Sequence, residues 1–564
     1  MNRFRASLTA LLGMLLVAVL VGCAQMPLSG PVQQGNQQEE DAPQDIRYFP
    51  SGPDAGATRE EIVQGFIDAG TGTQNDYSIA REYLTGNAAE NWNPDHQILV
   101  SDGQASMKAG TGENIVVSVP TYGKVDAHGV YAESLESSSA TLEFTLAQVD
   151  GEWRISEAPN GIVLIQQAFT DLFEPRTLVF FDGLQRYTSP DLRWFPDDNR
   201  AATRAVEELL SGPAQWMLPG QAVTSAFPAE AELISQVRVN GATAVVNFSD
   251  AVSSTSASAL SHMRLQLEQT LKSFPEITNV EMQVNGARLD VSLPSAEEVI
   301  TSPQVNSSPL VQQGTSLGYL SGGSITPPDG ADNVVAEVKR LEPIRGALSA
   351  SQQTVALLTD EGTYAMSFGD AEATFIDSRG GQVEPALDNW DWVWTQSTTE
   401  PGLHLTEIGT YQTFDLALPA GISPNFVSHQ VSRDGTRIAF LYEASDGVRL
   451  AITPIVRDEN ATPIRLGDPL VLALPGEQPN DVAWVDSNSV AMLIGSGEGT
   501  TDVRLYEIGG TFTTLGSIPS AMQTAGSNTL AGMRVIDRQG TLYAPRGTRW
   551  QASDVVVTFL YAQV

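Results

Sequence analysis

The sequence predicts a multidomain protein in which two α+β domains are followed by an all-β domain. Residues 59–165 and 166–296 each combine amphipathic helical periodicity with short alternating strands. Residues 333–564 contain strands that recur in units of similar pattern. Because a domain usually spans about 100–200 residues, a chain of 564 residues has room for three or four such units.

The N-terminus has the pattern of an export signal. Arg3 and Arg5 form a short basic region, and residues 8–21 are uncharged and almost wholly apolar. This stretch is shorter than the ~20 residues that a membrane-spanning helix needs, and its layout is that of a secretory signal. It ends in the sequence Leu20-Val21-Gly22-Cys23, and Cys23 is the only cysteine in the chain.

This ending resembles a bacterial lipobox, in which a small residue precedes the cysteine at the cleavage site. The resemblance implies that residues 1–22 are a signal peptide and that Cys23 receives an S-diacylglycerol group and an N-acyl group. Several acyl chains, at ~0.8 kcal/mol per buried CH₂, would make a stable anchor. We therefore expect a lipid-anchored protein on the extracytoplasmic face of the cell membrane.

The composition argues against several kinds of site. A single cysteine can form neither an internal disulfide nor a Cys-based zinc site. Without the signal peptide, 29 basic residues stand against 67 acidic residues, a net charge of −38. Nucleic-acid binding and polybasic attraction to anionic lipid both need basic patches. We expect no nucleic-acid partner, and we expect the lipid itself to make the membrane contact.

The first folded domain is expected to follow a flexible tether. Residues 23–58 carry many Gln, Pro, Gly, Asp and Glu residues and few large apolar ones, a composition that disfavours a packed fold. A capping box from Thr58 to Glu61 then begins a helix. Strands are predicted at 97–100, 115–122, 130–135 and 139–149, the last two joined by a Ser-rich turn. This domain, 59–165, resembles the cystatin and nuclear-transport-factor-2-like folds, many of which have a pocket in the concave face of the sheet.

Residues 166–296 predict a second α+β domain. A strand is expected at 187–195, helices at 200–210 and 257–273, and a hairpin that turns at Asn240-Gly241. A last strand pair is expected at 280–284 and 289–293. The order of these pieces resembles the GerMN domain of spore-germination and sporulation proteins. That resemblance implies a module for protein association at the envelope, without recognised catalytic residues.

The C-terminal region is predicted to be a β-propeller-like domain. Residues 297–332 are rich in Ser, Gly, Pro and Gln and are expected to be a linker. In residues 333–564 an inner, a middle and an outer strand recur at a spacing of roughly 40–50 residues, which leaves room for about five blades. We interpret Trp390, Trp392 and Trp484 as aromatic residues of the blade cores.

The motifs of the chain do not predict a catalytic, metal or cofactor site. The histidines, which show no metal-ligand spacing, are His96, His128, His262, His404 and His429. Gly314–Gly318 matches Gly-x-Ser-x-Gly, but a nucleophile elbow needs a strand before it and a helix after it. Gly495–Gly499 is interpreted as a hairpin loop, because neither Lys-Ser nor a helix follows it. With 67 acidic residues, paired carboxylates cannot be recognised from the sequence.

The complete arrangement resembles the LpqB family of actinobacterial lipoproteins. The stretches CAQMPLSGPVQ and RYFPSGPDAGATREEIVQGFIDA look like the start of the mature chain in that family. The resemblance implies an accessory regulator that binds the extracellular domain of the membrane sensor kinase of the Mtr two-component system and modulates envelope homeostasis and cell division. Two alternatives stay open. One is an envelope lipoprotein that binds a lipid or glycan fragment, and the less favoured one is a propeller hydrolase.

Overall fold

The computed structural model describes residues 50–564, apart from 111, 350–352, 401, 424, 475–477, 496–498 and 548, and apart from the side chains of 134–137. The predicted signal peptide, the lipobox residues Leu20, Val21 and Gly22, the lipid-attachment residue Cys23 and most of the tether lie outside the described residues. Within the described ranges, no helix combines the length and the apolar character needed to cross a membrane.

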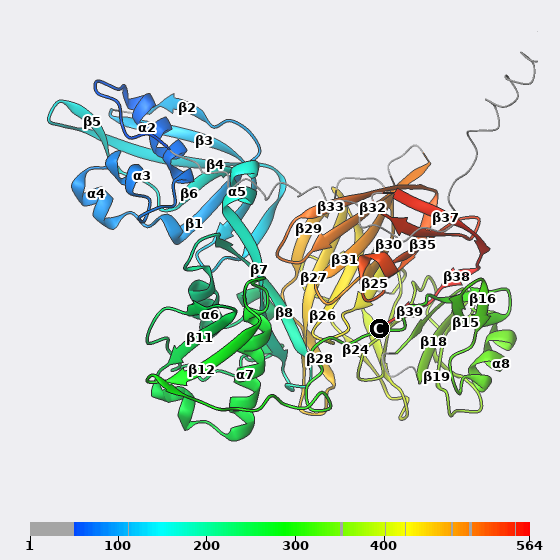
Figure 1. The fold of residues 1–564 in the computed structure, drawn as a ribbon. Helices are drawn as coiled ribbons and strands as arrows, with labels where there is room; N and C mark the ends of the chain where they lie inside the picture. The colour runs from blue at the N-terminus through cyan, green and yellow to red at the C-terminus, as the bar shows by residue number, and fades with distance from the viewer. Residues whose placement is uncertain are drawn as a thin grey trace, which may run out of the picture. The chain divides into compact units, whose positions relative to one another are not determined.

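The first domain combines short helices with one sheet (Figure 1). The helices are α2 (Arg59–Asp68), η1 (Ala69–Thr71), α3 (Ser78–Glu82), α4 (Gly86–Asn91) and η2 (Pro94–His96). The strands are β1 (Gln97–Ser101), β2 (Ser106–Ala109), β3 (Asn114–Asp126), β4 (Tyr131–Val149), β5 (Glu152–Glu157) and β6 (Ile162–Ile165). The strand order is β5-β4-β3-β1-β6, and β2 pairs with β3.

Local chemistry explains how this domain begins. The predicted capping box is confirmed: the Thr58 side chain accepts from the Glu61 amide, and the Glu61 carboxylate accepts from the Thr58 amide at 2.8 Å. The predicted Ser-rich turn, in contrast, is wrong. Residues 131–149 form one strand, and its pairing with β3 shifts register where Gly123 pairs with Glu133 and Thr121 pairs with Ser138.

The second domain contains two sheets and two long helices. The helices are α5 (Gln166–Leu172), α6 (Ala201–Ser211), η3 (Gln215–Met217), η4 (Asp250–Ser254) and α7 (Ala257–Leu271). The strands are β7 (Phe173–Asp182), β8 (Thr188–Pro196), β9 (Val223–Thr224), β10 (Arg238–Asn240), β11 (Thr243–Phe248), β12 (Asn279–Val284) and β13 (Ala287–Arg288). One sheet has the order β10-β11-β12-β13 and the other has the order β8-β7-β9.

Most elements of this domain follow the sequence prediction. The hairpin turns one residue later than expected: Asn240 pairs with Thr243, so the two-residue loop is Gly241-Ala242. The helices α6 and α7 bury their apolar faces in a single core with β7 and β11. The predicted strand at 289–293 is wrong, because β13 ends at Arg288 and only the Leu289 amide continues the pairing, at 2.9 Å from the Met282 carbonyl oxygen.

The described part of the C-terminal region forms six sheets of four or five strands. The first sheet contains β14 (Leu310–Gln313), β15 (Ser316–Ser321), β16 (Ser324–Thr326) and β38 (Phe559–Leu560). The second contains β17 (Arg345–Leu348), β18 (Thr354–Thr359), β19 (Gly362–Ser367), β20 (Thr374–Asp377) and β39 (Ala562–Gln563). The third contains β21 (Ala386–Leu387), β22 (Trp392–Gln396), β23 (Leu403–Glu407) and β24 (Thr413–Leu416).

The remaining sheets follow one another along the chain. The fourth contains β25 (Phe426–Val431), β26 (Arg437–Ala444), β27 (Gly447–Arg457), β28 (Pro463–Leu466) and β29 (Leu470–Leu474). The fifth contains β30 (Gln478–Trp484), β31 (Ser489–Gly495), β32 (Thr500–Glu507) and β33 (Phe512–Pro519). The sixth contains β34 (Ala521–Ala525), β35 (Arg534–Asp537), β36 (Thr541–Arg546) and β37 (Arg549–Val556). Two short helices, α8 (Asp332–Leu341) and η5 (Leu530–Gly532), complete the region.

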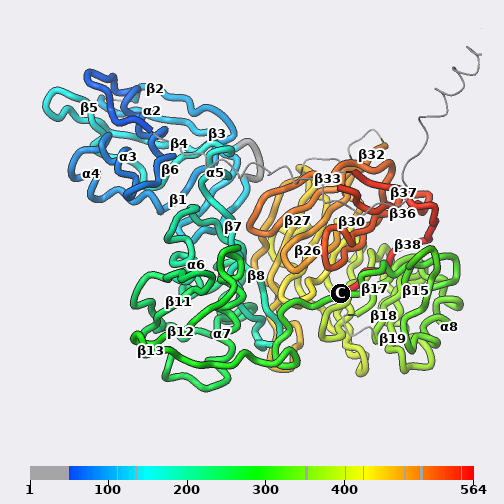
Figure 2. Tube along the Cα trace, viewed as in Figure 1, coloured from blue at the N-terminus to red at the C-terminus, as the bar shows by residue number. Residues whose placement is uncertain are grey.

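The end of the chain joins this region to its beginning. β38 pairs with β14, and β39 pairs with β17, so that the C-terminal segment lies beside strands more than 200 residues earlier (Figure 2). Each sheet is open by itself. The first strands of successive sheets lie next to one another in the order β17, β21, β25, β30 and β34, and β34 is followed by β38, which returns to β17.

The first sheet differs from the sequence prediction. Residues 297–332 were expected to be a linker, but three strands lie within them, and the described residues give six sheets where about five blades were expected. The Ser- and Gly-rich turns of this hairpin have the composition of a linker. Its partner, β38, lies some 250 residues away, so the local pattern gave no sign of a sheet.

Candidate functional site

Strand β8 connects all parts of the described chain and positions the candidate site. Each of its nine residues, Thr188–Pro196, is buried, although four of them are polar or charged. The strand was predicted at 187–195 and is confirmed with a shift of one residue. We call β8 the junction strand, because its side chains contact the first domain, the second domain and the strand-rich region.

The polar centre of the junction strand is the pair Arg193 and Asp191. Their side chains are only 2% and 3% exposed. The guanidinium donates to both carboxylate oxygens, at 3.0 and 2.7 Å, and to the His128 carbonyl oxygen of the first domain at 2.7 Å. Asp191 also accepts from the Ala214 amide at 2.9 Å. A buried ion pair with its hydrogen bonds satisfied in this way holds two domains in one arrangement.

The neighbouring Trp194 joins the first domain to the strand-rich region. Its ring lies 6.1 Å from the ring of Tyr131 in the first domain, between centroids, and its backbone amide donates to the Gly129 carbonyl oxygen at 2.8 Å. The indole nitrogen donates to the Gly509 carbonyl oxygen at 2.9 Å. Near the start of β8, the Ser189 hydroxyl lies 3.1 Å from the Thr436 hydroxyl, which is a second contact between the junction strand and the strand-rich region.

The predicted blade-core tryptophans divide between two environments. Trp392 and Trp484 are buried, at 5% and 2% exposure, within the cores of the strand-rich region. Trp390 is half-buried and faces the second domain, where its ring meets the ring of Tyr187 edge-on at 5.6 Å. The prediction is therefore confirmed for Trp392 and Trp484. Trp390 packs against the same core as Trp392 and also contacts the second domain.

A cavity of about 240 Å³ opens where the first and second domains meet beside the junction strand. Its apolar wall includes Tyr77, Ile98, Phe173, Trp194 and Phe195. Its charged and titratable residues are Asp95, Asp126, His128, Arg200, Arg204, Glu207 and Glu208. We call this cavity the interdomain cleft. Its size is somewhat below the ~300–1,000 Å³ of small-molecule sites, and it combines an apolar wall with charges of both signs.

Some charges of the cleft have partners. Glu208 lies 3.0 Å from His128 Nδ1 and 3.7 Å from an Arg193 nitrogen, and burial raises the pKa of its carboxyl. Arg204 donates to both oxygens of Asp198, at 2.8 and 2.9 Å. Desolvation by the surrounding groups raises the pKa of Asp95, whereas the charges of Arg204 and Arg200 lower it.

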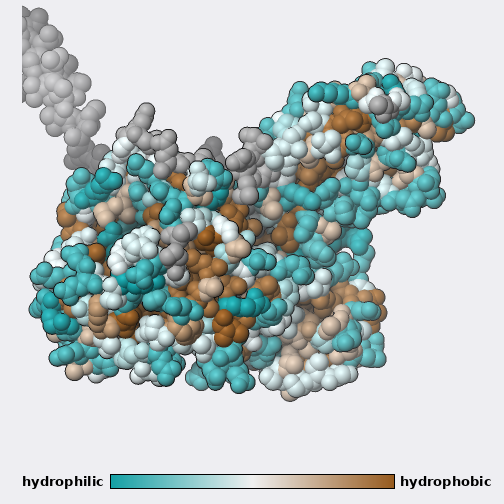
Figure 3. Space-filling model, turned by 180° about the vertical axis from the view of Figure 1, so that it is seen from behind, coloured by the Kyte–Doolittle hydropathy of each residue, from teal (hydrophilic) through white to brown (hydrophobic). Residues whose placement is uncertain are grey.

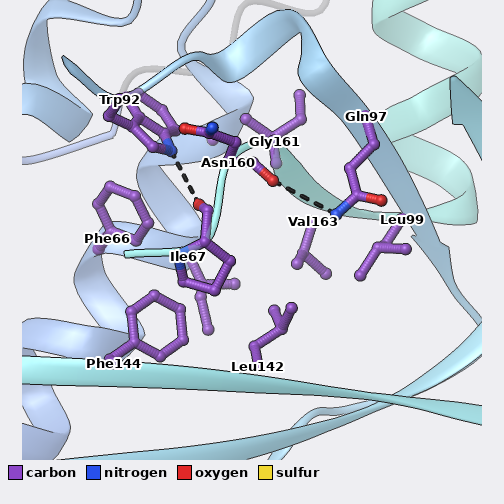
Figure 4. A pocket seen from close by; sticks show the side chains of 13 residues that line it. Phe66, Ile67, Trp92, Gln97, Leu99, Leu142, Phe144, Asn160, Gly161 and Val163 are labelled. Atoms are coloured by element: carbon purple, nitrogen blue, oxygen red, sulfur yellow. Dashed lines mark hydrogen bonds between the residues drawn. The ribbon is translucent and has the colours of Figure 1, made fainter. Parts of the chain in front are cut away.

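An apolar pocket in the first domain is much smaller. Figure 4 shows the rings of Phe66, Trp92 and Phe144 along one side of it. The Trp92 indole donates to the Pro159 carbonyl oxygen at 3.1 Å. The volume of this pocket is about 20 Å³, enough for a single water molecule. In this conformation the pocket does not accommodate the lipid or glycan fragment that the ligand-binding alternative requires.

A polar cluster occupies the centre of the strand-rich region, where the first strands of the sheets meet. Asp481 accepts from the Ser428 hydroxyl at 2.6 Å and from the Thr524 amide at 2.7 Å. Glu384 accepts from the Gln523 side-chain amide at 2.8 Å and lies 3.7 Å from Arg345. Burial raises the pKa of both carboxyls, and the charge of Asp481 raises that of Glu384 further.

This cluster holds strands together, and its groups face one another. The side chain of Gln523 donates to the Leu560 carbonyl oxygen at 2.7 Å and accepts from the Leu560 amide at 2.9 Å, which fastens β38. A hydrolase would need an acid and a base that reach a substrate. Asp481 and Ser428 are only 5% and 3% exposed. The carboxylates of Glu384 and Asp481 are 97 positions apart in the sequence, and no sequence motif links them.

The structure shows where the remaining sequence motifs and the histidines lie. In the Gly314–Gly318 motif, Gly314 and Thr315 form the turn between β14 and β15, and Ser316 is the first residue of β15, so no helix follows the serine. The Gly495–Gly499 loop follows β31 and lies partly outside the described residues. The five histidines are dispersed, and burial lowers the pKa of His429 to about 4. Among the described residues, no group of three or more His, Cys, Asp or Glu side chains could hold a metal ion.

Comparison with known proteins shows the relationship of the chain. Three family models match successive segments: "Lipoprotein LpqB, N-terminal domain" at residues 52–170, "Sporulation and spore germination" at 177–290 and "Lipoprotein LpqB beta-propeller domain" at 316–558. The chain belongs to the LpqB lipoprotein family. The family and the multidomain fold predicted from the sequence are thereby confirmed, with a GerMN domain followed by a strand-rich domain that the family model names a β-propeller.

Relatives in this family cover nearly the whole chain. Lipoprotein LpqB of Thermobifida fusca is 25% identical over 91% of both chains. Lipoprotein LpqB of Streptomyces avermitilis is 25% identical over 94% of both chains. Among solved structures, the first GerMN domain of the sporulation protein GerM from Bacillus subtilis is 22% identical, covers 22% of this chain and 96% of that chain, and has a TM-score of 0.19. The LpqB relatives are named as lipoproteins and not as enzymes.

Proposed function

We propose that the chain is a non-enzymatic accessory protein, anchored by a lipid on Cys23 to the extracytoplasmic face of the cell membrane. Its proposed partner is the extracellular domain of the membrane sensor kinase of the Mtr two-component system. By binding that domain it would modulate signalling in envelope homeostasis and cell division. The proposal comes from the family resemblance together with the properties of the described domains.

The observation that supports it most is the junction strand. A protein that influences a receptor by contact benefits from surfaces held in a defined arrangement, because less conformational freedom is lost on binding. Arg193, Asp191 and Trp194 connect the domains through buried hydrogen bonds. Several domains can therefore present one continuous binding surface.

The character of the surface agrees with a weak, polar interface. In Figure 3, hydrophilic residues surround smaller hydrophobic areas on the face shown. The large hydrophobic residues that are exposed are scattered over all three domains and include Val149, Ile165, Ile234, Val239, Phe375 and Ile464. A weak interface is sufficient if both partners are attached to the same membrane, since attachment raises their effective concentration.

The test is a binding measurement between the soluble mature chain, residues 24–564, and the purified extracellular domain of the kinase. We expect saturable binding that weakens as the salt concentration rises, because the chain is strongly acidic. The matched control is the extracellular domain of an unrelated sensor kinase of similar charge. Equal binding to both domains, or binding to neither at high concentration, would contradict the proposal.

A further inference from the structure

We propose that the interdomain cleft receives a lysine or arginine side chain of the partner protein. This inference rests on the proposed function, because it locates part of the surface that the partner would contact. The cleft lies next to the junction strand, where two domains meet, and binding sites often form between domains. Its volume of about 240 Å³ suits one long side chain better than a whole small-molecule ligand.

The apolar wall suits the stem of a long basic side chain. Phe173, Trp194 and Ile98 line the cleft from different strands. Lysine and arginine bury their methylene groups along apolar surface while the charged end stays among polar groups. An aromatic wall also attracts a cation through the ring quadrupole. A carboxylate or phosphate ligand would gain neither contact.

The charges of the cleft favour a cation. Four carboxylates line it, whereas only two arginines do. Arg204 is already paired with Asp198, and Glu208 is paired with His128 and Arg193. Within the described part of the chain, Asp95 and Glu207 have no side-chain ion pair, and both residues are exposed.

Two positive charges oppose the binding of a cation, because Arg204 and Arg200 both act on the Asp95 carboxylate. Arg200 also lines the cleft, so removal of its charge should strengthen the binding of a cation. Although Asp95 is exposed, neighbouring groups partly desolvate its carboxyl and raise its pKa. An incoming ammonium or guanidinium group would stabilise the ionised form of that carboxylate.

The experiment compares carboxamide variants of the mature chain, residues 24–564. Asp95→Asn combined with Glu207→Gln should weaken binding of the kinase domain by about tenfold or more, because the basic side chain would be left without its partners. Arg200→Gln should strengthen binding. The control combines Asp102→Asn with Glu276→Gln, two exposed acids of the same domains outside the cleft, and should leave binding unchanged. Circular dichroism spectra and thermal midpoints verify that each variant is folded.

A second probe separates this inference from the proposed function. The probe is a capped peptide, Ala-Ala-Lys-Ala-Ala, compared with the same peptide carrying acetyl-lysine, and its binding is followed by NMR on the mature chain. We expect weak binding of the lysine peptide that is lost in the Asp95→Asn, Glu207→Gln variant. If the kinase domain does not bind but the peptide does, the partner is wrong and the cleft is right. If the carboxamide variant binds both probes as the wild type does, or the wild type binds neither probe, the inference about the cleft is overturned.

Discussion

Replacement of Arg193 by methionine should loosen the junction strand severely. The guanidinium is nearly inaccessible and makes three hydrogen bonds shorter than or equal to 3.0 Å, two to Asp191 and one to the His128 carbonyl oxygen. Methionine fills much of the volume but leaves the Asp191 carboxylate buried with the Ala214 amide at 2.9 Å as its remaining strong donor. Removing one partner of a buried ion pair costs ~3–5 kcal/mol.

The assay is native-state hydrogen exchange of the β8 amides, because local opening can be followed there without two-state unfolding of the whole chain. A loss of ~3 kcal/mol corresponds to exchange about a hundredfold faster, since each 1.4 kcal/mol is a factor of about ten. In the double variant Asp191→Asn, Arg193→Met no unpaired charge is buried, so part of the protection should return.

The matched control is Arg238→Met in β10, an exposed arginine of the same domain. Its effect on stability should stay within ~0.5 kcal/mol, as for most surface substitutions. If Arg193→Met accelerated exchange by less than threefold, or if the double variant exchanged faster than the single one, the buried pair would not be what secures the junction strand.

Three further outcomes follow from the strand-rich region. Burial raises the folded-state pKa of Glu384 above its ordinary 4.5. The free energy of unfolding of the wild type should therefore fall as the pH rises above 4.5, because the unfolded chain releases this proton while the folded chain keeps it. Glu384→Gln should flatten this pH dependence in denaturant titrations, and an unchanged dependence would contradict the reasoning. Gly526→Ala should destabilise the chain by ~1–3 kcal/mol, because the new Cβ overlaps the Trp484 carbonyl oxygen, whereas Gly369→Ala, which enters open space, should be nearly neutral in urea unfolding. Deletion of residues 559–564 removes β38 and β39 and should lower the thermal midpoint by at least several degrees; calorimetry that shows no change would refute the closing role of these strands.

Elements that depend on neighbouring residues were predictable. The capping box at Thr58 and the hairpin near Gly241 follow from hydrogen bonds and turn preferences within a few residues, and the junction strand was predicted to within one residue. The Ser-rich segment at 131–149 was misjudged, because polar residues are compatible with a strand whose side chains alternate between two faces. The expected linker at 297–332 was misjudged for the related reason that its strand partner is distant in sequence.

The sequence by itself determined the family, the order of the domains and the lipid-anchor hypothesis for Cys23, because each depends on a contiguous motif or on local patterning. The tertiary structure alone decided which distant residues meet. It places Arg193 within hydrogen-bond distance of the His128 carbonyl oxygen and Asp481 close to Glu384. It also forms the interdomain cleft from residues of two domains. A carboxylate or an arginine carries the same charge at every position of a sequence, and only burial and three-dimensional neighbours decide whether that charge is solvated, paired or left for a partner.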